Sequence, residues 1–150
     1  MKENMNTVPH LFHGSSKGNI KLFEPRQAIT FGRPDGQPAV HATDEIEAAI
    51  FMAVLGSRHV GGWGLKNKTK FGFFIIDIHF EEAKQKNWSG YVYSLPSQTF
   101  YNRRKWEWTS TKPIKPLDSF AVGIENLPKN IYIMTSKEYR DYNKSQSTLQ

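Results

Sequence analysis

The sequence predicts an α+β domain with few helices, built around a mostly antiparallel β-sheet. Predicted strands outnumber predicted helices, strands and helices do not alternate as in a parallel sheet, and aromatic residues make up 13% of the 150-residue chain. Large rings favour strands because they pack well on a pleated surface. A chain of this length forms one domain, placed at residues 1–143, and residues 144–150 are expected to be a flexible polar tail.

The composition excludes several classes of site. Cysteine is absent, which rules out disulfides, thiolate metal sites and a cysteine nucleophile. There is no apolar run of membrane-spanning length and no secretory signal, so a cytoplasmic protein without a membrane partner is expected. Twenty Lys and Arg against fourteen Asp and Glu give a net charge of +6, which favours anionic partners such as nucleotides, nucleic acid or acidic proteins without choosing among them.

The first predicted strand starts at Val8 and ends in a Gly-Ser turn. His13 lies at its end, Gly14 permits close backbone approach, and Ser15 offers a hydroxyl to an oxygen-rich ligand. An ordinary strand-end turn with a surface histidine explains these residues equally well.

Residues 17–37 carry five Gly and Pro residues with little periodicity and predict a long irregular loop. Within this loop, Arg26 either reaches a phosphate or is a surface charge.

A short buried strand over residues 38–43 and then a helix are predicted next. Asp44 with Glu47 three residues later forms a capping-box pattern, and the helix is expected over about residues 45–55. Its apolar residues form two stripes at helical spacing. One stripe packs on the sheet, while the other either completes the core or lines a ligand cleft, and Phe51 is the ring we place in that cleft.

The second half of the chain predicts mainly strands. Residues 70–80 are nearly continuous in apolar side chains and predict the longest, central strand. Helical turns are expected at residues 81–86 and 136–142. The remaining strands are predicted at residues 90–96, 106–110, 119–124 and 130–134.

One of these strands places a single carboxylate between two indoles. Alternation puts Trp106 and Trp108 on one face and Glu107 on the other. Glutamate is a poor strand former, so its presence indicates a face that is wet, paired or functional. A solvated edge-strand glutamate paired with Arg103 or Lys105 is the simpler interpretation, and a catalytic carboxylate is the alternative.

Three of these segments, in this order, resemble the motifs of the ADP-ribosyltransferase superfamily. Leu-Phe-His-Gly-Ser at residues 11–15 resembles the first motif. Val-His-Ala-Thr followed by Ala-Ala-Ile-Phe, within residues 40–51, resembles the second, and Lys-Trp-Glu-Trp-Thr at residues 105–109 resembles the third. The resemblance spans about residues 11–110. It departs from the His-Tyr-Glu class in carrying Val40 where those members carry Tyr, and the Ser-Thr-Ser strand of the Arg-Ser-Glu class is absent.

The resemblance implies an NAD-dependent mono-ADP-ribosyltransferase, which cleaves the nicotinamide–ribose bond and transfers ADP-ribose to a protein or nucleic-acid acceptor. It implies that the antiparallel sheet is split, as in other ADP-ribosyltransferase-like domains. It also implies that NAD is the substrate, that no metal takes part, and that Glu107 and His13 are the catalytic residues. A monomer is expected, and a toxin or effector role is included in the expectation. The NAD-binding residues expected are His13, Gly14, Ser15, Arg26, His41, Thr43 and Phe51, the last packing on the nicotinamide. The acceptor-binding residues expected are Tyr101, Arg103, Arg104 and Trp106.

The mechanism that the resemblance implies makes physical sense of Glu107. Loss of nicotinamide leaves positive charge on the ribose, and a fixed carboxylate stabilises that charge best where water is excluded. Arg103, Arg104 and Lys105 are expected to keep the carboxylate ionised. They are also expected to face outward from a loop at residues 97–105 and to select the acceptor.

Two other functions remain open. The first is a non-catalytic module of the same fold that binds a nucleotide or an ADP-ribosylated partner. The second is an RNA 2′-phosphotransferase-like enzyme, which would use the surplus of positive charge to hold phosphate and in which His41 would take the place of a second histidine.

Overall fold

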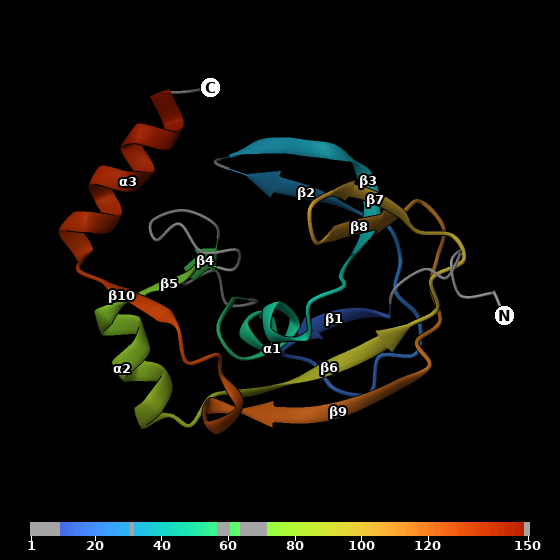
Figure 1. Cartoon of the computed structure of the whole chain (residues 1–150), viewed down its shortest axis with the longest axis horizontal. Helices are drawn as coiled ribbons and strands as arrows, with labels where there is room; N and C mark the ends of the chain where they lie inside the picture. The colour runs from blue at the N-terminus through green and yellow to red at the C-terminus, as the bar shows by residue number, and fades with distance from the viewer. Residues whose placement is uncertain (1–9, 31, 57–60, 64–71, 149–150) are drawn as a thin grey trace, which may run out of the picture.

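The computed structural model describes residues 10–30, 32–56, 61–63 and 72–148. It confirms the predicted class, an α+β fold with mostly antiparallel strands in a curled sheet (Figure 1). The larger sheet contains β1 (Leu11–Ser15), β2 (Arg26–Thr30), β3 (Arg33–Thr43), β6 (Ser89–Leu95), β7 (Tyr101–Arg104), β8 (Glu107–Ser110) and β9 (Asp118–Gly123). The smaller sheet contains β4 (Gly61–Trp63), β5 (Phe73–Ile76) and β10 (Ile131–Met134). The helical elements of the described part are α1 (Ile46–Val54), α2 (Asp77–Gln85), α3 (Ser136–Thr148) and the short 3-10 helix η3 (Ile124–Asn126).

The larger sheet has the strand order β7-β8-β3-β1-β6-β9, with β2 also paired to β3, and the smaller sheet has the order β10-β5-β4. Five residue pairs join β1 to β6, whereas the pairing of β1 with β3 consists of Phe12 opposite Thr43. Strands β1 and β3 therefore diverge, and the sheet curls between its β7-β8-β3 part and its β1-β6-β9 part (Figure 1). Among the pairs of the smaller sheet, β10 and β5 run parallel.

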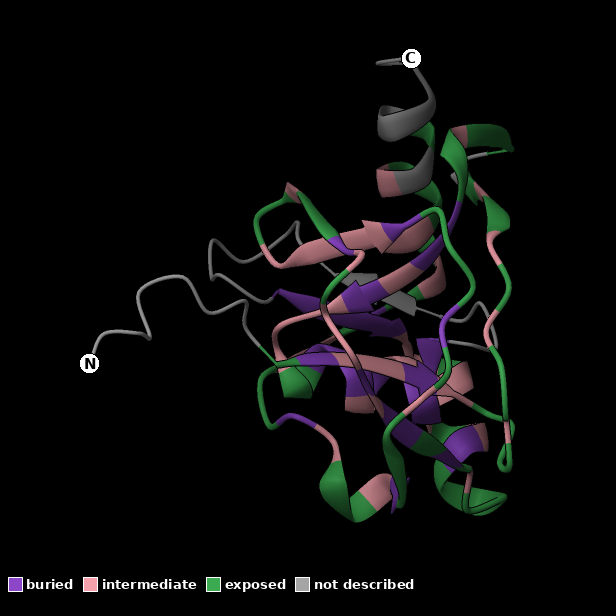
Figure 2. Ribbon diagram, turned by 90° about the vertical axis from the view of Figure 1, so that its right-hand side faces the viewer, coloured by how far each residue is buried: buried purple, intermediate pink, exposed green. Residues whose placement is uncertain are grey.

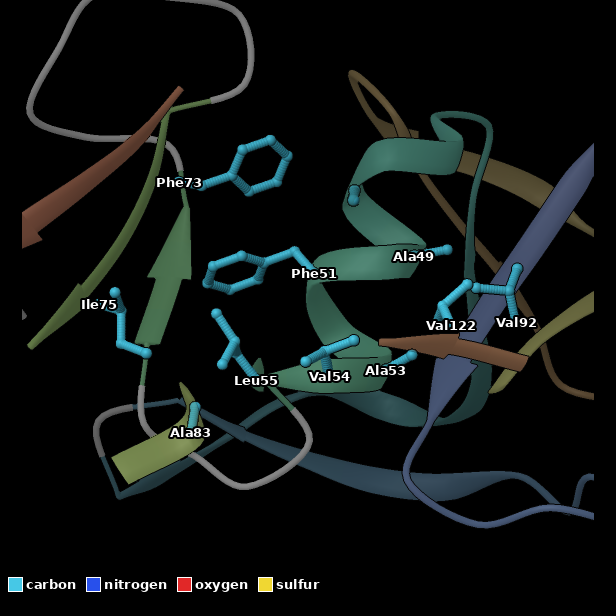
Figure 3. Packing of buried hydrophobic residues seen from close by; sticks show 11 residues of the cluster. Ala49, Phe51, Ala53, Val54, Leu55, Phe73, Ile75, Ala83, Val92 and Val122 are labelled. Atoms are coloured by element: carbon cyan, nitrogen blue, oxygen red, sulfur yellow. The ribbon is translucent and has the colours of Figure 1, made fainter. Parts of the chain in front are cut away.

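The main core surrounds α1, which packs against both β1 and β6 and carries aromatic contacts to β5 (Figure 3). The Phe51 ring stacks on Phe73 with ring centroids 5.1 Å apart. A Cβ at Gly14 would lie 2.0 Å from the carbonyl oxygen of Ala49, and one at Gly90 would meet the helix backbone just as closely. Glycine at these two positions lets the strand backbones approach α1, so the space beside the helix is filled.

A second core lies around the other side of β1 and β3. Its buried members are Leu11, Val40, Ala42, Tyr93, Leu95, Phe100 and Ile114. The side chain of Trp108 is partly buried against this cluster, which agrees with the predicted alternation that turns Glu107 to the opposite face. Figure 2 shows the buried residues gathered in the interior and many of the exposed ones in the loops and turns at the periphery.

The predicted helix is confirmed to within a residue or two, but the predicted capping box is wrong. No side chain caps the start of α1. The Asp44 carboxylate instead accepts a hydrogen bond from the indole Nε1 of Trp108 at 3.0 Å, and the backbone N–H of Glu45 donates to the Thr43 hydroxyl at 3.1 Å. A partner distant in the sequence has therefore displaced a local capping interaction.

Two predicted loops contain strands. Residues 17–37 were expected to be irregular, yet β2 and the first half of β3 form a hairpin that closes at Thr30 and Arg33, and Gly32 has the positive φ of 79° that such a turn favours. Residues 97–105 include β7, which pairs with β8. Both segments are polar and lack a clear strand periodicity, yet both form strands of hairpins.

Two further boundaries differ from the prediction. The strand expected over residues 70–80 ends at Ile76, and α2 begins at Asp77, with Phe80 and the fully buried Ala83 at helical spacing against the core. The last helix was expected to end near residue 142 and to be followed by a flexible tail, but α3 continues to Thr148. The predicted start of the first strand, Val8, lies outside the described residues. None of the described helices is long and apolar enough to cross a membrane.

Candidate functional site

Three adjacent strands, β8, β3 and β1, bring together Glu107, His41 and His13. The Nδ1 atom of His41 lies 3.4 Å from Oε2 of Glu107. The Nδ1–H of His13 donates a hydrogen bond to the backbone carbonyl of His41 at 2.7 Å. In the part of the chain that the structure describes, His41 thus links the two residues that the resemblance assigns to catalysis.

Glu107 is also bound by two arginines of β7. Arg104 Nε donates to Oε1 at 2.8 Å and Arg103 Nη1 donates to Oε2 at 3.2 Å. The pairing of β7 with β8 shifts register between Asn102 and Arg104. Such an irregularity can turn consecutive side chains toward one partner. The expectation that these arginines face outward, away from the glutamate, is therefore wrong. The simpler interpretation is confirmed in the pairing of Glu107 with Arg103, but it is wrong in placing Glu107 on an edge strand, because β8 lies between β7 and β3.

The Glu107 carboxylate is held ionised. Burial alone would raise its pKa, but hydrogen bonds from His41 and Arg104 and the positive charges of Arg104 and Arg103 outweigh that effect and lower the pKa to about 2. Its side chain remains 26% exposed. A negative charge that is fixed in place and partly shielded from water can stabilise positive charge that develops on a bound molecule.

His13 is held neutral and oriented. Burial lowers its pKa, the hydrogen bond to the His41 carbonyl partly opposes this, and the charges of His41 and Arg26 lower the pKa further. The ring packs against Phe23 with centroids 4.7 Å apart. Because a carbonyl can only accept, Nδ1 carries the proton, and Nε2 is left as a hydrogen-bond acceptor.

His41 is the ring that faces Glu107 from β3. Val40, the residue at the position of the family's Tyr in the motif comparison, is 3% exposed and belongs to the second core. The Nε2 atom of His41 is buried, and it has no hydrogen-bond partner among the described residues. Buried ring nitrogens are normally paired, so an unpaired one beside an ionised carboxylate is a feature of functional interest.

Three of the predicted NAD-binding residues serve other contacts. Phe51 is fully buried in the main core, so the prediction that its ring lines a ligand cleft is wrong. Gly14 is buried against α1, which makes its role close packing. The Thr43 hydroxyl accepts the hydrogen bond at the start of α1 described above. These residues support the site from outside it.

The remaining predicted residues lie nearer the surface. The Ser15 hydroxyl accepts a hydrogen bond from the backbone of Lys17, and Arg26 is exposed at the start of β2. Tyr101 of β7 is 75% exposed and pairs with Thr109 of β8. Trp106 lies in the turn before β8, so the prediction that it belongs to the strand is wrong.

Sequence reasoning missed Asp35. This aspartate on β3 forms ion pairs with both arginines: one oxygen with Arg103 Nη2 and the other with Arg104 Nη2 at 3.3 Å. An available signal was the dipeptide Asp35-Gly36, because Asp-Gly is typical of hairpins and their bulges. It lay in the segment predicted to be irregular, and its partners follow almost 70 residues later.

No protein-family model, curated protein or solved structure matches the chain. The ADP-ribosyltransferase resemblance accordingly stays a prediction based on its three motifs. Within the described ranges, no group of three or more His, Asp or Glu side chains is arranged to hold a metal ion.

Proposed function

We propose that the protein is an NAD-dependent mono-ADP-ribosyltransferase in which Glu107 is the catalytic carboxylate. The observation that carries the proposal is the position of this carboxylate, ionised and partly exposed beside His41, with His13 on the next strand. NAD is the proposed substrate, the cytoplasm the proposed location, and the protein is proposed to act as a monomer. The order of the three motifs along the chain and the confirmed fold class support the same proposal.

The reaction requires stabilisation of a cation. The bond between C1′ of the ribose and the nicotinamide nitrogen breaks, and its electron pair leaves with nicotinamide. The ribose then carries positive charge until an acceptor atom bonds to C1′ and gives up its proton. In the proposed reaction the negative charge of Glu107 stabilises that cation, and a charge fixed before the reaction needs no reorganisation during it.

The two histidines have distinct proposed roles. The neutral ring of His13 presents Nε2 as an acceptor for a ribose hydroxyl, and its orientation is fixed by the bond to the His41 carbonyl. His41 helps hold Glu107 in its ionised form. Tyr101 and Arg104, whose side chains are exposed, are the proposed contacts to a protein or nucleic-acid acceptor.

Release of nicotinamide from labelled NAD tests the proposal. We expect wild-type protein to release nicotinamide and Glu107→Gln to lose about a hundredfold or more of the rate, because the change removes charge at nearly constant shape. Glu81→Gln is the matched control, since Glu81 is an exposed carboxylate of α2 paired with Lys84. Wild-type turnover by the Glu107→Gln variant contradicts the assignment. NAD binding without turnover by the wild-type protein favours the non-catalytic module instead.

A further inference from the structure

Asp35, Arg103, Arg104 and Glu107 form a closed ring of ion pairs, called the charged ring below, which includes the proposed catalytic carboxylate. The two carboxylate oxygens of Asp35 contact Arg103 and Arg104, and the same two guanidinium groups contact the two oxygens of Glu107. Each arginine therefore bridges two carboxylates. Neither guanidinium can leave its place without breaking two ion pairs.

The main chain around Asp35 is shaped to receive Arg103. Gly36 has a φ of +77°, and a Cβ at this position would lie 3.3 Å from Arg103 Nη2. The side-chain amide of Gln27 on β2 donates to the Gly36 carbonyl at 2.7 Å, which ties this bend to the neighbouring strand. A side chain at residue 36 would therefore crowd the Arg103 guanidinium. Glycine at this position leaves the β2–β3 hairpin the space that the guanidinium occupies.

Holding two long side chains in one geometry costs conformational entropy, and exposed ion pairs often return little stability for that cost. The side chain of Arg104 is 58% exposed, so its contact with Glu107 alone would be weak. A second carboxylate on the far side of both guanidiniums restricts them further. The stability that the ring contributes is therefore smaller than its number of ion pairs suggests, and its main consequence is that the charges are held in fixed positions.

We propose that Asp35 is a positioning residue, which acts through the two arginines to hold the Glu107 carboxylate in one place. Its consequence for catalysis rests on the proposed function, but its consequence for the charge state of Glu107 does not. Among the described residues, the charged and titratable groups in contact with Glu107 are His41 from β3 and Arg103 and Arg104 from β7, and Asp35 from β3 contacts both arginines.

Two explanations of the role of Asp35 predict opposite changes in the pKa of Glu107 when Asp35 is removed. The direction of the measured change therefore distinguishes them. If Asp35 acts only as a nearby negative charge, its loss lowers the pKa of Glu107 or leaves it unchanged, because a like charge has gone. If Asp35 positions the arginines, its loss lets them move away, and the pKa of Glu107 rises toward the ordinary value of 4.5.

The experiment is a carbon-13 NMR titration of the Glu107 carboxyl group in the full chain, assigned by comparison with Glu107→Gln. We expect Asp35→Ala to raise the pKa of Glu107 by about one unit or more, and Asp35→Asn, which keeps an oxygen acceptor, to raise it less. Asp141→Ala, which breaks an exposed ion pair with Lys137 on α3, is the control and should leave Glu107 unchanged. If Asp35→Ala does not fold, the Asp35→Asn titration decides.

An unchanged or lowered pKa of Glu107 in the folded Asp35 variants overturns the inference. Nicotinamide release from the same variants supplies a second measurement: a loss in kcat at unchanged KM is expected for Asp35→Ala, with partial rescue in Asp35→Asn. If wild-type protein releases no nicotinamide, the proposed function fails, while the titration still tests the role of Asp35. The two failures are therefore distinguishable.

Discussion

The core around α1 and the charged ring around Glu107 use burial in opposite ways. In the core, Phe51 is fully buried, and glycine at residue 14 lets a strand lie directly against the helix backbone. In the ring, Glu107 and Arg103 keep about a quarter of their side chains exposed, and each is held by ion pairs. One region leaves no space for a ligand, while the other presents fixed charge at the edge of solvent.

The contrast separates residues that the motif resemblance had grouped together. Phe51 and Gly14 belong to two of the three motifs, yet both pack the interior. His41 and Glu107 come from the second and third motifs, and they contact each other outside that core. A motif can therefore combine scaffold residues with residues that carry chemistry, and the three-dimensional contacts tell them apart.

The largest effect on stability is expected from the core. Phe51→Ala should reduce the free energy of unfolding by about 3 to 5 kcal/mol, because it removes a buried ring and leaves a cavity. Ile46→Ala on the same helix, where the side chain is 40% exposed, is the control and should cost far less. Urea unfolding followed by near-ultraviolet circular dichroism measures both. A cost below about 1 kcal/mol for Phe51→Ala would return this ring to a ligand-facing position.

Much of the fold was predictable because its signals are local. The spacing of apolar residues located α1 to within a residue or two, and short apolar runs located β6, β9 and β10. Local signals failed where a long-range contact decided the outcome. Asp44 was predicted to cap α1, but the Trp108 indole binds its carboxylate. The run ending at Ile76 was predicted to continue as a strand because short apolar runs do not distinguish a buried strand from a buried helix.

Less of the site was predictable. Glu107, His13 and His41 were identified from their residue types and order, whereas the orientation of Arg103 depends on a register shift that no sequence pattern marked. Asp35 was missed because its role appears only when the β2–β3 hairpin folds against β7. Ion pairs between residues so far apart in the chain leave no periodic trace in one sequence.

The charged ring should contribute a moderate, acid-sensitive stability. Because the folded-state pKa of Glu107 is lowered from 4.5 to about 2, its ion pairs stabilise the protein above pH 4.5, and the contribution is lost as the pH falls toward 2. Glu107→Gln should therefore cost about 1 to 2 kcal/mol at pH 7, after allowance for solvent screening. Unfolding of both proteins at a series of pH values measures the difference. A difference that persists unchanged at pH 2 would show that charge is not its cause.

The smallest effect is expected at His13, whose ring donates a hydrogen bond to the His41 carbonyl. The folded-state pKa of His13 is lowered from 6.5, so the unfolded chain binds the extra proton more readily and stability falls as the pH drops below 6.5. The slope cannot exceed about 1.4 kcal/mol per pH unit for one proton. His13→Gln should flatten the dependence of the free energy of unfolding on pH between pH 6.5 and 5, as measured by urea unfolding at a series of pH values. His79→Gln on α2 is the control and should leave this dependence unchanged. An identical slope in wild-type and His13→Gln proteins would assign the pH dependence to another group.

The most direct test of the account compares nicotinamide release by one variant from each region. Phe51→Leu keeps the core apolar and nearly filled, and Glu107→Gln keeps the shape of the site while removing its charge. We predict that Phe51→Leu, once shown to be folded, releases nicotinamide from labelled NAD within about threefold of the wild-type rate, and that Glu107→Gln loses about a hundredfold or more. Equal losses in both variants, or wild-type release by Glu107→Gln, would contradict the claim that the chemistry belongs to the charged ring.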